Sequence, residues 1–160
     1  MLTHQKIEPL QLFNHLRGRW QLKRHLGAQG YMQGVACFQT WGQGVLYYQE
    51  QGRVTLAKSK VFAAYRAYAY VYDQGTIAVH FWNPTQKQPD GLLHTLQFKS
   101  LAGQALVATG THWCADDVYK ACYTFVNPTQ FQLTYQVQGP HKAYTIQTHF
   151  SKAIDTAAAS

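Results

Sequence analysis

The chain has 160 residues, of which 13% are charged and 14% aromatic, with tyrosine the most frequent aromatic type. Its formal charge of +7 suits an anionic partner, but the 14 Lys and Arg residues are scattered without a run of three, which argues against a nucleic-acid surface. No apolar run approaches the ~20 residues of a membrane-spanning helix, and Cys37, Cys114 and Cys122 lack the spacing of a disulfide framework.

The size of the chain predicts one domain over residues 1–160, since a chain of this length buries about two-thirds of its surface in a single fold. The first ten residues, MLTHQKIEPL, have neither the apolar stretch nor the small-residue cleavage site of a secretory signal. We therefore expect a cytoplasmic protein with reduced thiols, monomeric or homodimeric, and with no nucleic-acid or membrane partner.

The N-terminal segment carries the one convincing helical pattern, over residues 9–16. Leu10, Phe13 and Leu16 recur at helical spacing, and Gly18 can end the helix. Because the apolar stripe is short, we expect this helix to plug or cap a larger structure.

From Arg19 onward, apolar and polar residues alternate with the period of two that is typical of β-strands. On the first strand, Trp20, Leu22 and Leu26 share a face that Arg24 interrupts. Turns are expected at Gln51-Gly52 and Asp73-Gln74-Gly75, and a loop over residues 83–91. The expected strands are 19–26, 32–41, 45–50, 53–59, 61–72, 76–82, 92–98, 104–114, 117–126, 130–138 and 143–150.

About ten consecutive strands after one helix predict an antiparallel meander. Closing such a meander into a barrel removes its exposed edges, whereas a sandwich is the structural alternative. Barrels of roughly eight or more strands have room for a ligand among their interior side chains. We therefore expect an all-β fold, an antiparallel barrel of about ten strands with a short N-terminal helix.

The expected strand over residues 61–72 places a guanidinium group beside phenols. Arg66, Tyr68 and Tyr70 share one face, while the opposite face is small and apolar and could pack beneath the helix. A forked cation next to a hydroxyl group suits a carboxylate or phosphate. The alternative is an outward-facing arginine stacked on tyrosines at a wet surface.

Histidine and cysteine side chains suggest a second group. His112 and Cys114 share one face of a strand, so they could bind a metal together with Asp117 or His94. The same thiol with a histidine could act as nucleophile and base. Against both stand the absence of a typical metal-ligand spacing and the inertness of most buried cysteines. A haem-binding barrel would need only one proximal histidine.

Residues 111–125 are expected to form two strands joined by an Ala115-Asp116-Asp117 turn. Asp117, Tyr119 and Tyr123 then lie on one face, where they could form a hydrogen-bond network or supply a general acid and base. Aspartates at a hairpin tip also bond to their own backbone, which Asp116 fits better than Asp117.

Several short patterns occur in the chain in a fixed order. They are Gly18-Arg19-Trp20, Leu46-Tyr47-Tyr48-Gln49-Glu50-Gln51-Gly52, Phe62-x-Ala64-x-Arg66-x-Tyr68-x-Tyr70, His112-x-Cys114-x-x-Asp117-x-Tyr119-x-x-x-Tyr123-x-Phe125 and Gly139-Pro140-x-Lys142-x-Tyr144. The set resembles a family of uncharacterised, mostly bacterial, lipocalin-like (calycin-type) β-barrels, over nearly the whole chain. The resemblance implies the barrel and an internal cavity but no activity. Tyr70 stands where Trp is expected in the family, which affects the shape of the cavity rather than the barrel.

We therefore expect the barrel interior to bind a small, anionic and partly apolar ligand, without a cofactor or a metal. Arg66 and Tyr68 would anchor the anion, and Trp20 and Phe125 would form an apolar floor. The alternatives are an enzyme of the isomerase or hydrolase type that uses the same cavity, and a haem- or metal-binding barrel. The candidate ligand-binding residues are Arg66, Tyr68, Tyr70, His94, His112, Asp117, Tyr119, Tyr123 and Tyr144.

Overall fold

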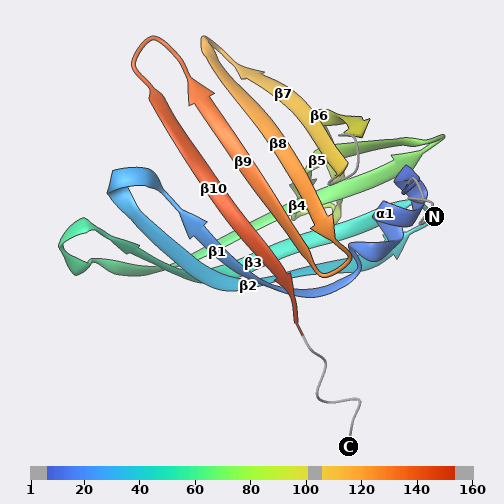
Figure 1. Ribbon diagram of the computed structural model, residues 1–160, viewed down its shortest axis with the longest axis horizontal. Helices are drawn as coiled ribbons and strands as arrows, with labels where there is room; N and C mark the ends of the chain where they lie inside the picture. The colour runs from blue at the N-terminus through green and yellow to red at the C-terminus, as the bar shows by residue number, and fades with distance from the viewer. Residues whose placement is uncertain (1–6, 101–105, 154–160) are drawn as a thin grey trace, which may run out of the picture.

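The computed structural model describes residues 7–100 and 106–153, which form one α-helix and ten β-strands (Figure 1). Two short 3₁₀ segments, Gly27–Gln29 and Ala57–Ser59, lie in loops between strands. The elements are α1 (Pro9–His15), β1 (Gly18–His25), β2 (Gly30–Gly42), β3 (Val45–Leu56), β4 (Val61–Asp73), β5 (Thr76–Asn83), β6 (Gln88–Ser100), β7 (Leu106–Cys114), β8 (Asp117–Asn127), β9 (Gln130–Gln138) and β10 (Ala143–Lys152).

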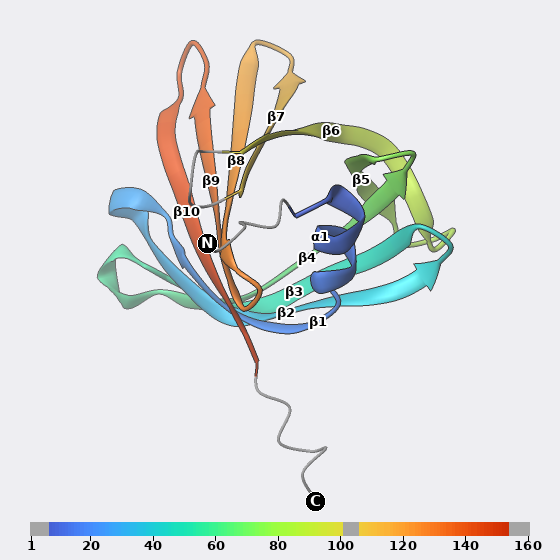
Figure 2. The ribbon, with the colours of Figure 1, turned by 45° about the vertical axis from the view of Figure 1, so that its right-hand side comes forward.

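The ten strands form a closed antiparallel barrel. Each strand pairs with its neighbours in the sequence, and β1 pairs with both β2 and β10, which closes the sheet. Figure 2 shows the strands curving around a common interior, with α1 at one end. The closed strand order confirms the predicted barrel rather than the sandwich, although residues 61–67 of β4 and 110–114 of β7 pair with a neighbouring strand on one side only.

The helix closes one end of the barrel with a face that includes Phe13 and Leu16 of the predicted stripe but not Leu10. Leu12, Phe13 and Leu16 are buried, whereas Leu10 is 46% exposed. The ring of Phe13 lies 5.7 Å from that of Tyr72, which is on the phenol face of β4. The helix therefore covers the end of the barrel interior, next to the phenol face of β4, and not the small apolar face that the sequence left as a possibility.

The predicted turn at Gln51-Gly52 was also wrong, because β3 runs through both residues. Gly52 lies opposite Gly34 of β2. A Cβ atom on either glycine would overlap with backbone atoms of the other strand. This pair of glycines therefore allows two strands to approach closely and does not reverse the chain.

The predicted loop over residues 83–91 was too long. Only residues 84–87 form a turn, and β6 already begins at Gln88. Pro89 is tolerated in this strand next to a shift of the β5–β6 register, where the ladder is already irregular. The predicted start of the next strand at residue 104 lies outside the described residues.

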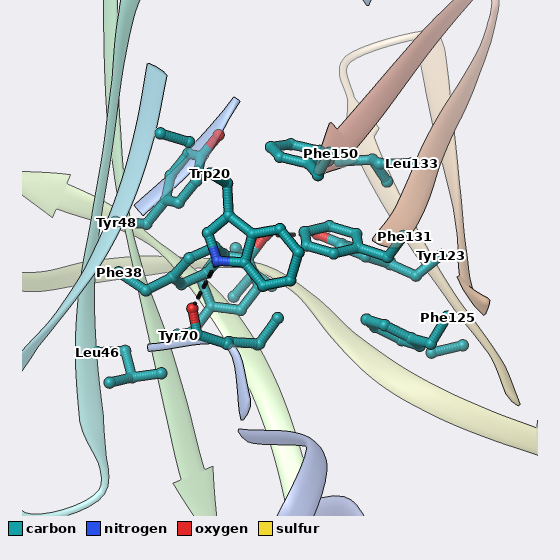
Figure 3. Packing of buried hydrophobic residues seen from close by; sticks show 14 of the residues in the cluster. Trp20, Phe38, Leu46, Tyr48, Tyr70, Tyr123, Phe125, Phe131, Leu133 and Phe150 are labelled. Carbon is teal, nitrogen blue, oxygen red and sulfur yellow. Dashed lines mark hydrogen bonds between the residues drawn. The ribbon is translucent and has the colours of Figure 1, made fainter. Parts of the chain in front are cut away.

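Aromatic rings fill the closed end of the barrel (Figure 3). The centroid of the Trp20 ring lies 4.9 Å from that of Phe131, which stacks at 4.3 Å on Phe150. Trp20 also donates a hydrogen bond of 2.8 Å from Nε1 to the carbonyl oxygen of Leu16, which ties β1 to the end of the helix. Trp20 and Phe125, the predicted apolar floor, are both buried here. Among the described residues, no helix is long and apolar enough to cross a membrane.

Candidate ligand-binding site

The end of the barrel away from α1 is open to solvent. Phe62, Phe81 and Tyr144 lie on the inward-facing sides of their strands, yet their exposed fractions are 48%, 40% and 42%. Further along the same faces, toward the helix, Tyr70, Val79 and Phe150 are buried. We call this open end the mouth.

A cluster of three charged side chains lies between the aromatic core and the mouth. Glu50 of β3 is 2% exposed and contacts Arg24 of β1, with Nη2 at 2.9 Å from Oε2 and 3.1 Å from Oε1. Arg24 is buried and also donates a hydrogen bond from Nε to Oγ1 of Thr148, at 2.8 Å. Arg66 of β4 lies further out: its side chain is 48% exposed, and its Nε is 4.0 Å from Glu50 Oε1. Two guanidinium groups thus share one carboxylate, which leaves a positive charge at the mouth.

Arg24, Glu50 and Thr148 were not among the predicted site residues. Arg24 was interpreted as an interruption of an apolar face, although it has the same parity as the buried Trp20 and Leu22. Glu50 likewise follows the buried Leu46 and Tyr48 at a spacing of two. Opposite charges at inward positions of two strands were the signal that could have revealed the pair.

The environment of Arg66 favours its charged form. Burial alone lowers the pKa of Arg66, but Tyr68, Glu50, Tyr135 and Tyr48 together more than offset this and raise it. Tyr68 is half-buried on the same face of β4, two residues away. The predicted neighbours Arg66 and Tyr68 therefore both lie on the inner wall near the mouth.

Tyr70 and Tyr123 meet deeper in the barrel. Their hydroxyl oxygens are 2.8 Å apart, across the barrel from β4 to β8 (Figure 3). Both side chains are buried, and burial raises the pKa of each phenol well above its usual value. These two predicted residues thus form a hydrogen-bonded pair of neutral phenols, in which each hydroxyl group already has the other as a partner.

His94 of β6 is the most enclosed of the predicted histidines, with an exposed fraction of 2%. Its ring takes the space that a side chain on Gly110 of β7 would need. The ring centroids of Tyr123 and Tyr135 lie at 6.3 and 6.2 Å. Burial, with a smaller effect of His112, lowers the pKa of His94 to about 4, so the imidazole is neutral at pH 7.

The remaining predicted residues lie at the rim of the mouth. Half-buried His112 has Nδ1 at 3.0 Å from the carbonyl oxygen of Leu93, and its ring lies 6.2 Å from that of Tyr119. Asp117 Oδ2 is 3.1 Å from Nζ of Lys142, so the charges of these two residues offset each other. Tyr144 is partly exposed on β10.

The structure thus divides the predicted set into a buried group and a rim group. The buried group consists of His94, Tyr70 and Tyr123. The rim group includes the predicted residues within 112–119, which are His112, Asp117 and Tyr119. Cys114, the partner of His112 in the proposed metal pair, is exposed. Within residues 7–100 and 106–153, no group of three or more His, Cys, Asp or Glu side chains could hold a metal ion.

Comparison with known proteins gives a family and a fold. The model of a family of unknown function, DUF6314, matches residues 16–152. The S-type phycobiliprotein lyase of Guillardia theta is similar in structure, with a TM-score of 0.58 and 7% identity over 94% of this chain and 95% of the lyase. A redesigned β-barrel, mFAP1, bound to DFHBI, has a TM-score of 0.40 and 14% identity over 87% and 96% of the two chains. No curated protein matches the sequence.

Proposed function

The chain belongs to DUF6314, a family of unknown function, and from the geometry of its barrel we propose that it binds a small, partly apolar organic anion at the mouth. We propose further that residues 1–160 form one lipocalin-like (calycin-type) domain of a cytoplasmic, bacterial protein, monomeric or homodimeric, with no nucleic-acid partner. The similarity to the phycobiliprotein lyase supports the barrel fold, and the proposed site is argued from the side chains of this chain.

The observation that carries this proposal is the surplus guanidinium of Arg66. Glu50 is already engaged by Arg24 at hydrogen-bond distance, while Arg66 is 4.0 Å away and half-exposed. An anionic group that enters the mouth can therefore pair with Arg66 without displacing the buried pair. A carboxylate or phosphate would accept two parallel hydrogen bonds from the guanidinium fork.

Aromatic side chains around Arg66 account for the apolar part of the ligand. Tyr68 and Phe81 lie on neighbouring strands with ring centroids 6.3 Å apart, and both face inward. Such rings offer large apolar contact surfaces at little cost in side-chain entropy. The ligand we propose therefore has an anionic head and an apolar body.

Native mass spectrometry of the purified protein, together with fluorescence titration by 2-naphthoate, tests the proposal. We expect a retained small molecule or micromolar naphthoate binding in the wild type, and an affinity at least about tenfold lower in Arg66→Gln. Arg53→Gln is the matched control, because Arg53 is exposed on the outer face of β3. Equal affinities in the wild type and Arg66→Gln would contradict the proposal.

A further inference from the structure

A buried nitrogen atom inside the barrel has no hydrogen-bond partner. Nε2 of His94 is excluded from solvent and unpaired within the described residues 7–100 and 106–153. Buried polar atoms in folded proteins are nearly always paired, because an unpaired one loses its hydration without compensation. An exception such as this one points to a partner that arrives from outside the chain.

The surroundings of His94 hold its ring in place without satisfying Nε2. Gly110 leaves room for the ring on β7, since a Cβ atom there would overlap with it. The ring of Tyr123 is close, but its hydroxyl group is already bonded to that of Tyr70 at 2.8 Å. The ring of Tyr135 approaches nearly edge-on, at an interplanar angle of 82°.

The chemistry of a neutral imidazole selects the group that can pair with it. In a neutral imidazole one ring nitrogen carries the proton and the other does not, so Nε2 is a donor in one tautomer and an acceptor in the other. A hydroxyl group can donate to the bare nitrogen or accept from the protonated one. It is therefore the complement that fits both tautomers of His94.

The strand register places His94 deeper in the barrel than Arg66. His94 pairs with Val79, and Val79 pairs with Tyr70, which is four residues along β4 from Arg66. At a rise of about 3.3 Å per residue, the two levels are roughly 13 Å apart along the strands, and the two residues are also separated by two strand spacings of about 4.8 Å each. Because the side chain of Arg66 is long, a ligand that pairs with it would need a body of about two fused rings to reach the level of His94.

We propose that the ligand is a hydroxylated organic anion, whose anionic group pairs with Arg66 at the mouth and whose hydroxyl group hydrogen-bonds to Nε2 of His94. This inference rests on the proposed function and names the ligand class for the same site. A ligand without the hydroxyl group would leave Nε2 unpaired and would therefore bind with lower affinity.

Fluorescence titration with 6-hydroxy-2-naphthoate and 2-naphthoate at pH 7.5 tests this bipartite site. We expect the wild type to bind the hydroxylated probe at least about tenfold more tightly. His94→Phe keeps a flat ring but removes both nitrogens, so its affinity for the hydroxylated probe should fall to that for 2-naphthoate. Arg66→Gln should weaken both probes by a similar factor and preserve their ratio, and Arg53→Gln should change neither.

The outcomes separate this inference from the proposed function. Equal affinity of the wild type for the two probes, or a preference that survives in His94→Phe, overturns the pairing with His94 and leaves the anion site intact. Failure of both probes to bind, or affinities that Arg66→Gln leaves unchanged, overturns both proposals. If His94→Phe does not fold, the ¹⁵N shift of His94 Nε2 in the wild type decides: it should change with 6-hydroxy-2-naphthoate, and a shift that stays constant overturns the pairing.

Discussion

Arg24 and Arg66 face the same carboxylate but differ in burial, so we expect substitutions at the two positions to have different effects. Arg24 is 7% exposed and donates to both Glu50 and Thr148. Arg66 is half-exposed and lies 4.0 Å from Glu50. The contacts of the buried arginine therefore lie within the fold, whereas the outer one remains accessible to the ligand that we propose.

The same substitution at the two positions should have unequal effects on stability. Arg24→Gln leaves Glu50 buried without its close partner, so we expect the free energy of unfolding to fall by about 3 kcal/mol or more. Arg66→Gln removes a distant, solvent-screened contact, for which about 1 kcal/mol or less is expected. Urea unfolding followed by circular dichroism measures both, and equal losses would contradict the division of roles.

His94 should make stability depend on pH in a defined window. Its pKa is about 4 in the folded protein and about 6.5 in the unfolded chain, so the unfolded chain binds the proton first as the pH falls. The free energy of unfolding should therefore drop between pH 6.5 and 4, by up to about 3 kcal/mol from this group. Urea unfolding of the wild type and of His94→Phe at several pH values isolates the effect, since all other groups titrate in both proteins. If the free energies of unfolding of the two proteins change in parallel with pH, the prediction is refuted.

At the scale of the elements, the alternation of residues predicted most strands because one face of each is buried. On β9, Phe131, Leu133 and Val137 are all buried, as the pattern indicated. The pattern failed at Gly52, because a glycine at this position is as compatible with a turn as with a close approach of two strands. Only the position of Gly34 on the neighbouring strand decides between the two.

The glycine pair of β2 and β3 gives the prediction at this scale. Gly52→Ala places a Cβ atom against the backbone of Gln33 and Gly34, which cannot move aside as a flexible side chain would. We expect a loss of several kcal/mol in the free energy of unfolding, or failure to fold. Gly91→Ala on β6 is the matched control, because a Cβ atom there meets nothing within 4 Å. Thermal melting compares them, and similar melting temperatures would contradict the close approach.

At the scale of the whole molecule, the barrel itself could be predicted. For its inner charge cluster, the alternation could reveal Arg24 and Glu50 as charged residues at inward positions, but not which residues they contact. The number of strands and their short connections favoured a closed meander, as observed. The contacts of Arg24 reach 26 positions along the chain to Glu50 and 124 positions to Thr148. Periodicity within single strands carries no information on such distant partners, which only closure of the barrel brings together.

The asymmetry of the barrel predicts where a ligand will shield tyrosines from modification. Tyr68 lies inside the mouth beside Arg66, whereas Tyr31 and Tyr65 are exposed on the outer wall, at 47% and 63%. Saturating 2-naphthoate should therefore slow the nitration of Tyr68 by tetranitromethane severalfold and leave the two outer tyrosines unchanged.

Each tyrosine serves as its own reference in this measurement, because the phenols differ in reactivity before any ligand is added. Tyr47, for example, should react slowly throughout, since burial and its hydrogen bond with Tyr65 raise its pKa to about 12. Peptide mass spectrometry gives the rate at each position with and without the probe. Protection of Tyr31 or Tyr65 without protection of Tyr68 would place the naphthoate on the outer wall, and the mouth would no longer be the binding site.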